Sequence, residues 1–125
     1  MGRTTVTESR NIFARLMAVL EDRRRNPPER SYTTALFRGG VAKIGAKLSE
    51  ETAEVVEAAA EEGTDGHRHL VHEAADVLYH LFVLLAHRDV GLGEVEQELA
   101  QRFGVSGLDE KAARHTPGSK EANDG

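Results

Sequence analysis

Apolar side chains recur every three or four positions along most of this chain, and that spacing restricts the folds it can adopt. Such a pattern places apolar groups on one face of an α-helix, whereas a half-buried strand would need strict alternation. No segment sustains that alternation, so the sequence predicts an all-α fold, a short helical bundle. The two longest stripes are formed by Ile44, Leu48, Val55 and Ala58, and by Leu70, Val77, Leu81 and Leu84.

Glycine and proline divide this pattern into expected elements. The first helix should span residues 8 to 25, before Asn26-Pro27-Pro28. Ser31 should cap a short helical turn that Gly39 and Gly40 end. The remaining expected elements are helices over 41–62, 67–88 and 94–103, with a loop at 63–66. The expected regions are an N-terminal helical extension at 1–30, an all-α domain at 31–108 and a disordered tail at 109–125.

Size and charge narrow the function classes. A core built from 125 residues without tryptophan is small, so association with further copies is expected. The net charge of −5 argues against non-specific nucleic-acid binding, which needs a basic surface. The absence of cysteine excludes disulfides and thiolate chemistry. No apolar stretch reaches the ~18 residues of a membrane span, so a soluble cytoplasmic protein without a membrane partner is expected.

Carboxylates interrupt the apolar stripe of segment 41–62. Glu51 falls in the middle of that stripe, and Glu54 follows it at i, i+3 on the same face, while Glu50 lies at the edge. A carboxylate that faces a core is costly unless it is paired or binds a metal. The pattern therefore marks Glu51 and Glu54 as candidate ligands.

Segment 67–88 repeats this anomaly on one flank. Glu73 and Asp76 are again spaced i, i+3, and if the two helices pack antiparallel the two pairs can face each other. Four converging carboxylates repel one another without a cation, and oxygen-only ligands select Mg²⁺ or Mn²⁺. That arrangement suits hydrolysis of a phosphoanhydride. Either pair alone is more often a solvated helix face; both together favour the metal site. The other members of the flank are His69, His80 and His87.

Three better-known motifs are excluded by their missing residues. His72-Glu73-Ala74-Ala75-Asp76 lacks the final histidine of a zinc protease helix. Neither carboxylate pair supplies the Glu-x-x-His of di-iron bundles. Gly39-Gly40 lacks the Gly-Lys-Ser/Thr of a P-loop.

Several other polar residues have two open interpretations. Lys43 and Lys47 either bind phosphate oxygens or pair with the glutamates one turn away. Arg38 is a weaker phosphate candidate of the same kind. His80 either touches substrate or is a hydrogen-bonded structural residue, and the structural interpretation is slightly favoured.

Several segments between residues 31 and 104 follow one another in a recognisable order. They are Ser31-Tyr32-Thr33, Gly40, Ile44, Lys47, Glu50-Glu51-Thr52-Ala53-Glu54-Val55-Val56 and Glu73-Ala74-Ala75-Asp76-Val77-Leu78-Tyr79-His80. In these segments the chain resembles the phosphoribosyl-ATP pyrophosphatase family, within the all-α MazG-like nucleotide pyrophosphohydrolases. Leu48-Ser49 and Thr52 are mild departures from the pattern of that family.

The resemblance implies a Mg²⁺-dependent homodimer that hydrolyses phosphoribosyl-ATP to phosphoribosyl-AMP and pyrophosphate in L-histidine biosynthesis. By position, it implies catalytic roles for Glu50 and Glu51, with Glu50 either activating a water or holding a metal ligand in place. It also implies phosphate contacts from Lys47 and Lys43. It places Tyr32 and Thr33 near the substrate. The metal ligands that it implies are Glu51, Glu54, Glu73 and Asp76.

Two other functions remain open at this point. A related MazG-like enzyme would apply the same chemistry to another nucleoside triphosphate. A non-enzymatic helical interaction module would bind no metal.

Overall fold

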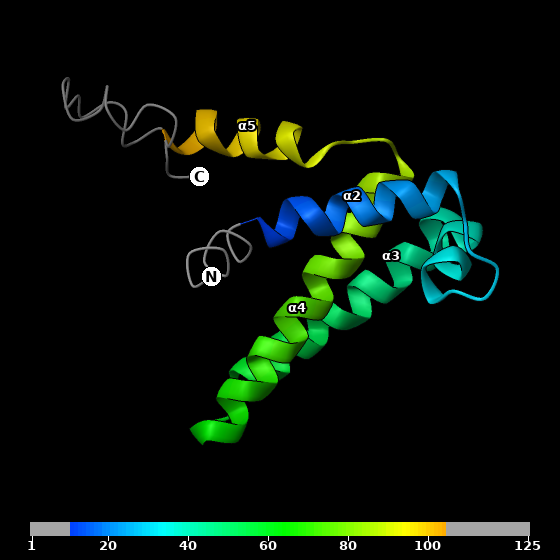
Figure 1. Ribbon diagram of the computed structural model, residues 1–125. Helices are drawn as coiled ribbons and strands as arrows, with labels where there is room; N and C mark the ends of the chain where they lie inside the picture. Colours follow the sequence, from blue (N-terminus) through cyan, green and yellow to red (C-terminus); the bar gives the residue numbers. More distant parts are fainter. Residues whose placement is uncertain (1–10, 105–125) are drawn as a thin grey trace, which may run out of the picture. The chain divides into compact units, whose positions relative to one another are not determined.

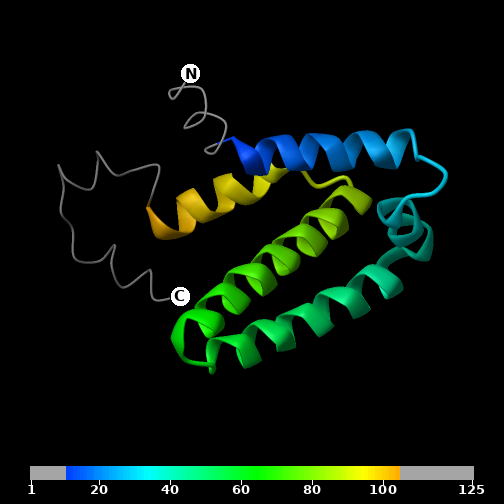
Figure 2. The ribbon, with the colours of Figure 1, turned by 60° about the horizontal axis from the view of Figure 1, so that its bottom comes forward.

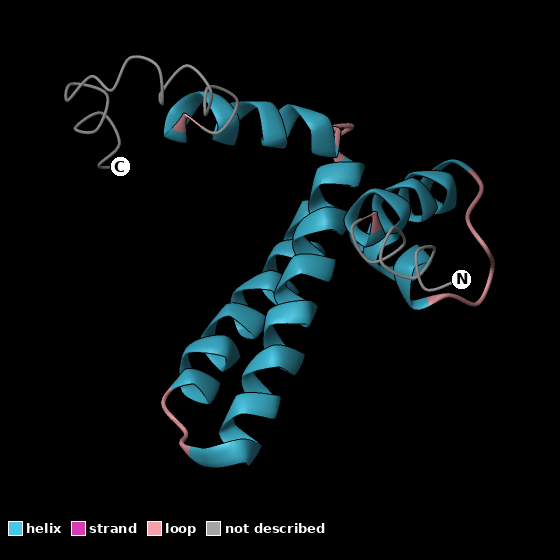
Figure 3. Cartoon of the chain, turned by 60° about the vertical axis from the view of Figure 1, so that its left-hand side comes forward, coloured by secondary structure: helices cyan, strands magenta, loops and turns pink. Residues whose placement is uncertain are grey.

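The computed structural model describes residues 11–104, and every regular element in that range is an α-helix (Figures 1 and 3). The expected all-α fold is confirmed. The expected helix start at residues 8 to 10 and the expected tail at 109–125 lie outside the described residues. The helices are α2 (Ile12–Arg25), α3 (Tyr32–Ala59), α4 (Gly63–His87) and α5 (Leu92–Phe103). They belong to two compact units, one ending at Asp89 and one beginning at Val90.

The first unit is organised around an antiparallel hairpin of α3 and α4, which lie side by side in all three ribbon views (Figures 1, 2 and 3). Residues 60–62 connect the two helices. The loop expected at 63–66 is therefore wrong, because these residues form the first turn of α4. Gly66 is buried there, and a Cβ at this position would lie 2.5 Å from the Glu61 carbonyl oxygen. Gly66 thus allows the backbone of Glu61 to pack closely on the first turn of α4, and it does not form a loop.

Gly40 bends α3 where the sequence predicts a joint. Its backbone angles are φ 70° and ψ −165°, while the residues on either side are helical. A positive φ favours glycine, since other residues are strained there. The short turn and the helix expected from 41 are thus the two parts of one kinked helix, which ends at Ala59 rather than at 62.

The start of α3 is fixed by two hydroxyl groups. Ser31 Oγ accepts a hydrogen bond from the Thr34 N–H at 3.3 Å, as expected of an N-cap. The Thr34 hydroxyl donates to the Pro28 carbonyl at 2.7 Å. The segment before α3 is therefore tied to its first turn.

The helices α3 and α4 face each other with the sides that carry the carboxylates, as the antiparallel arrangement predicted. On α3, Ile44, Glu51 and Ala58 are buried, which confirms the expected stripe. On α4, the expected apolar stripe is only half-buried, and the flank that holds Glu73 and His80 is buried instead. Toward the C-terminal end of α4, the buried residues are the apolar Phe82, Val83 and Ala86.

α2 packs on both helices of the hairpin. Met17 and Leu20 are its buried residues, and the ring of Phe13 meets Phe82 edge-on with centroids 5.9 Å apart. Arg24 also forms an ion pair with Asp89, just beyond the end of α4. The first helix thus completes the core at that end of the hairpin.

Within the second unit, α5 begins two residues earlier than expected. The Gly91 N–H donates to Glu94 Oε2 at 3.1 Å and caps the helix start. Gly104 ends the helix with φ 72°, the left-handed conformation typical of a glycine C-cap.

One described helix, α4, is long and apolar enough by length and composition to cross a membrane. No such helix was expected from the sequence. α4 lies along α3 with Glu73 and His80 buried, and 28% of its most apolar 18-residue stretch is buried.

Candidate metal centre

Three carboxylates meet between α3 and α4. Glu51 and Glu54 lie one turn apart on α3, and the antiparallel packing brings Glu73 of α4 opposite them. One oxygen of each residue lies within 4.8 Å of the others. The structure therefore brings together three of the four expected metal ligands.

Two of these carboxylates are buried, and each has one oxygen without a hydrogen-bond partner. Glu51 and Glu73 are each only 8% exposed, and Oε1 of each is buried without a hydrogen-bond partner. A buried carboxylate oxygen without a partner is unfavourable, so such a group is paired, protonated or bound to a cation. A set of carboxylate oxygens fits a hard divalent ion such as Mg²⁺ or Mn²⁺.

The proximity of these groups changes their acidity. Burial, the neighbouring Glu73 carboxyl and the charge of Asp76 raise the pKa of Glu51 to about 7. The hydrogen bond and charge of Glu73 also raise the pKa of Glu54. Burial acts to raise the pKa of Glu73, but the neighbouring Glu51, Glu54 and His69 together outweigh it, and this pKa is lowered. Near neutral pH the cluster can therefore hold a proton in place of a cation.

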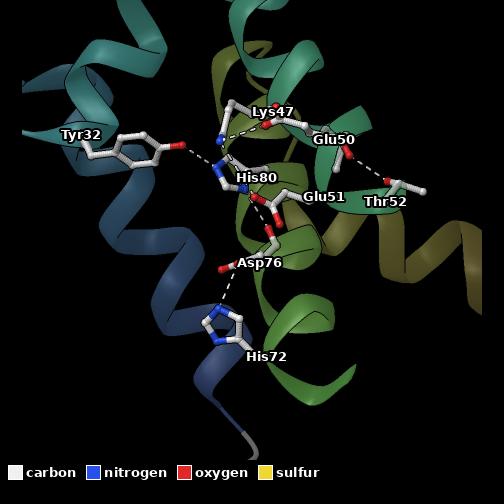
Figure 4. A network of polar contacts seen from close by, with 9 residues as sticks. Tyr32, Lys47, Glu50, Glu51, Thr52, His72, Asp76 and His80 are labelled. Atoms are coloured by element: carbon white, nitrogen blue, oxygen red, sulfur yellow. Dashed lines mark hydrogen bonds and ion pairs between the residues drawn. The ribbon is translucent and has the colours of Figure 1, made fainter. Parts of the chain in front are cut away.

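Asp76 stands beside this group rather than in it. It is half-buried and close enough for its charge to raise the pKa of Glu51. His72 Nε2 lies 3.5 Å from Asp76 Oδ2, and Figure 4 shows the ring directed at that carboxylate.

Lys47 extends over the carboxylates from one turn earlier on α3. Its Nζ lies 3.2 Å from Glu50 Oε1 and 4.0 Å from Glu51 Oε2 (Figure 4). The hydrogen bond with Glu50 raises the pKa of Lys47. The structure thus shows the ion pair that was one of the two expected interpretations, with the Lys47 side chain still partly exposed. Lys43 and Arg38 are exposed and make no ion pair within residues 11–104.

Tyr32 and His80 join the start of α3 to the middle of α4. His80 is buried, and its Nδ1 donates to the Asp76 carbonyl oxygen at 2.8 Å. Nε2 therefore accepts from the Tyr32 hydroxyl, also at 2.8 Å (Figure 4). Both ring nitrogens are engaged, which favours the structural interpretation of His80, whereas the Tyr32 ring is half-exposed.

A pair of hydroxyl groups lies next to the contact between Tyr32 and His80. The hydroxyls of Thr33 and Tyr79 are 2.5 Å apart, and the rings of Tyr79 and Tyr32 stack with centroids separated by 6.4 Å. Thr33 is only 2% exposed, so it supports this end of the site from within. Tyr79 was not singled out from the sequence, although it belongs to the segment that carries the family resemblance.

His69, for which no role was predicted from the sequence, contacts two carboxylates. Its Nδ1 lies 3.1 Å from both carboxylate oxygens of Glu61, and its Nε2 lies 3.1 Å from Glu73 Oε2. The hydrogen bond with Glu61 is the largest cause that raises the pKa of His69. The i, i+4 spacing of His69 and Glu73 was visible in the sequence, but Glu61 was expected inside a helix.

Comparisons with known proteins match the part of the chain that holds these residues to one family. Residues 13–103, which include every residue of the site, match the family described as phosphoribosyl-ATP pyrophosphohydrolase. The chain is 50% identical over 100 residues to a phosphoribosyl-ATP pyrophosphatase of Rhodopirellula baltica, covering 80% of this chain and 83% of that protein. It is 50% identical over 102 residues to a phosphoribosyl-ATP pyrophosphatase of Rhodobacter capsulatus, covering 82% and 96%.

Proposed function

Because the chain belongs to the phosphoribosyl-ATP pyrophosphohydrolase family, we propose that it hydrolyses phosphoribosyl-ATP to phosphoribosyl-AMP and pyrophosphate, a step of L-histidine biosynthesis. Such a biosynthetic role suits the cytoplasm. The observation that carries the proposal is the group of Glu51, Glu54 and Glu73, with two buried carboxylate oxygens that lack partners. Phosphoanhydride hydrolysis needs charge neutralisation at this kind of site.

These three residues, with Asp76 beside them, would hold Mg²⁺, for which Mn²⁺ can substitute. When bound, the ion supplies charge neutralisation for phosphate oxygens and lowers the pKa of a water. Glu51 would give up its proton to bind the ion, since the free carboxyl holds that proton up to about neutral pH.

Glu50 and Lys47 would act at the exposed edge of the cluster. The Glu50 carboxylate is exposed, one position from Glu51, and can accept a proton from an attacking water. Lys47 would exchange its contact with Glu50 for a phosphate oxygen, which its partly exposed side chain allows. Lys43 and Arg38 are exposed cations on the same helix and would meet more distant phosphates.

Tyr32 would contact the substrate through its half-exposed ring. Thr33 and His80, named as substrate contacts from the sequence, are buried and would act by holding Tyr79 and Tyr32. This division assigns recognition to the exposed groups and orientation to the buried ones.

A second copy of the chain would cover the apolar outer surface of the hairpin. Val56, Val71 and Leu78 are large apolar residues left exposed on α3 and α4, and the expected apolar stripe of α4 is only half-buried. Burying such surface is favourable at about 25 cal/mol per Å². A homodimer mass in light scattering at micromolar concentration supports this arrangement, and a monomer mass contradicts it.

The activity is tested by pyrophosphate release from phosphoribosyl-ATP, measured with Mg²⁺ and with a chelator. Release that depends on the metal supports the proposal. Release only from other nucleoside triphosphates in a panel would assign the chain a different substrate within the same chemistry. No release from any nucleotide by a helical, folded protein would overturn the enzymatic proposal.

A further inference from the structure

We propose that His69, held in place by Glu61, is a positioning residue that orients the Glu73 carboxylate toward the metal ion. This inference rests on the proposed function, because it concerns the same site. His69 lies outside the three-residue carboxylate group, so it would act on the ion only through Glu73.

The two oxygens of Glu73 have different surroundings. Oε2 lies 3.1 Å from His69 Nε2, whereas Oε1 is buried without a partner. A donor on one oxygen fixes the plane of the carboxylate and leaves the other oxygen for the ion. Carboxylates that bind metals are commonly oriented by such a second hydrogen bond.

Glu61 restricts the imidazole ring from its other side. Both of its carboxylate oxygens lie 3.1 Å from His69 Nδ1, and because carboxylates only accept hydrogen bonds, the ring held between Glu61 and Glu73 carries an N–H on each nitrogen. Glu61 belongs to the connection between α3 and α4, and buried Gly66 lets the first turns of α4 approach its backbone. The compact end of the hairpin thus places Glu61 where it can hold the ring.

The neighbouring pair of His72 and Asp76 shows that the spacing alone does not produce this arrangement. His72 has the same i, i+4 relation to its carboxylate, but the separation is 3.5 Å and 70% of its side chain is exposed. No second carboxylate restrains His72 among the residues that the structure describes. The Glu61–His69–Glu73 contact is therefore specific to one ligand.

The experiment measures Mn²⁺ binding to the metal-free full-length protein by electron paramagnetic resonance of the free ion. The variants are His69→Ala, His69→Gln, which keeps a side-chain N–H donor, and Glu61→Gln. His67→Ala is the matched control, since His67 is an exposed histidine on the same helix. Circular dichroism of each variant reports whether the helices are retained.

We expect His69→Ala to weaken Mn²⁺ binding about 10- to 100-fold, the range typical of outer-shell partners. His69→Gln should recover most of the affinity, Glu61→Gln should show a smaller loss, and His67→Ala should bind like the parent. The Mg²⁺ concentration for half-maximal turnover should rise in His69→Ala, while kcat at saturating Mg²⁺ changes little.

Two results overturn the inference in distinguishable ways. Parent protein that binds Mn²⁺ while His69→Ala binds it equally well removes the positioning role and leaves the proposed function intact. Parent protein that binds no Mn²⁺ removes the metal site itself, and with it this inference. Equal weakening by His69→Ala and His69→Gln in helical proteins would also contradict it, because a hydrogen bond would then not be the cause.

Discussion

The Tyr32 hydroxyl and His80 Nε2 lie 2.8 Å apart and connect the first turn of α3 to the middle of α4. The ring of His80 is buried, so this hydroxyl is the donor that satisfies a nitrogen without access to water. The contact therefore holds together the two helices that carry the carboxylates, and it also aims the exposed face of Tyr32.

Replacement of Tyr32 with Phe should leave that nitrogen without a donor. We expect a loss of about 1–3 kcal/mol in the free energy of unfolding, the penalty for a buried polar atom that loses its partner. Urea unfolding monitored by circular dichroism measures it. An unchanged midpoint would show that His80 Nε2 is satisfied in some other way.

Replacement of Glu54 or Glu73 with Gln should abolish turnover while the fold is retained. Each change removes a negative ligand oxygen from the three-carboxylate group. We expect a loss greater than the roughly 100-fold upper range for outer-shell partners. The measurement is pyrophosphate release in Mg²⁺, with Glu57→Gln as control because Glu57 is exposed one turn further along α3. Full activity in either variant would contradict the ligand assignment.

Replacement of Glu51 with Gln should stabilise the metal-free protein at pH 8. The pKa of Glu51 is raised from 4.5 to about 7 on folding. Between these values the folded protein binds more protons than the unfolded chain, so the free energy of unfolding falls as pH rises. At pH 8 the wild-type Glu51 is a buried anion. The neutral amide of glutamine removes the cost of burying that charge.

This change should raise the melting temperature in chelator by about 4 °C or more for each kcal/mol gained. The advantage should shrink at pH 5, where folded Glu51 is protonated. Scanning calorimetry at both pH values checks this pattern, and a variant that melts lower than wild type at pH 8 would refute it.

Replacement of Gly40 with Ala should destabilise the protein, because its φ of 70° is strained for any residue with a side chain. With ψ at −165°, this is a backbone region that is essentially restricted to glycine, and the expected loss is about 1–3 kcal/mol. Gly45→Ala is the matched control and should stabilise the protein. A Cβ at Gly45 meets nothing within 4 Å, and alanine is the better helix former. Thermal unfolding of both variants measures the difference. Equal effects would show that Gly40 does not need its unusual conformation.

Much of this fold follows from the sequence, for identifiable physical reasons. The stripe of Ile44, Glu51 and Ala58 is visible because helical periodicity survives in a helix that is half exposed. The Gly40 joint is visible because glycine breaks helical pattern. The inward position of the Glu73 flank of α4 was predicted from the facing carboxylate pairs, whereas the apolar stripe of α4 is only half-buried.

The candidate site could be predicted less completely. The carboxylate group follows from the i, i+3 spacing and an antiparallel hairpin, so Glu51, Glu54 and Glu73 were found in advance. The contact between Glu61 and His69 could not be predicted from the sequence. It depends on a connection that begins at residue 60, whereas the glycines indicate a loop that begins at residue 63. Tyr79 was missed because a tyrosine beside a core position has no distinctive sequence pattern.

The three carboxylates come from a single local hairpin, with roughly twenty residues of chain between Glu51 and Glu73. Contacts between such near neighbours along the chain form quickly during folding, since little loop entropy is lost in closing them. The same collapse that forms the hairpin therefore gathers the negative charge that opposes it. A divalent ion in the surrounding solution would remove that opposition, so we expect the refolding rate of the metal-free chain to increase when Mg²⁺ is added.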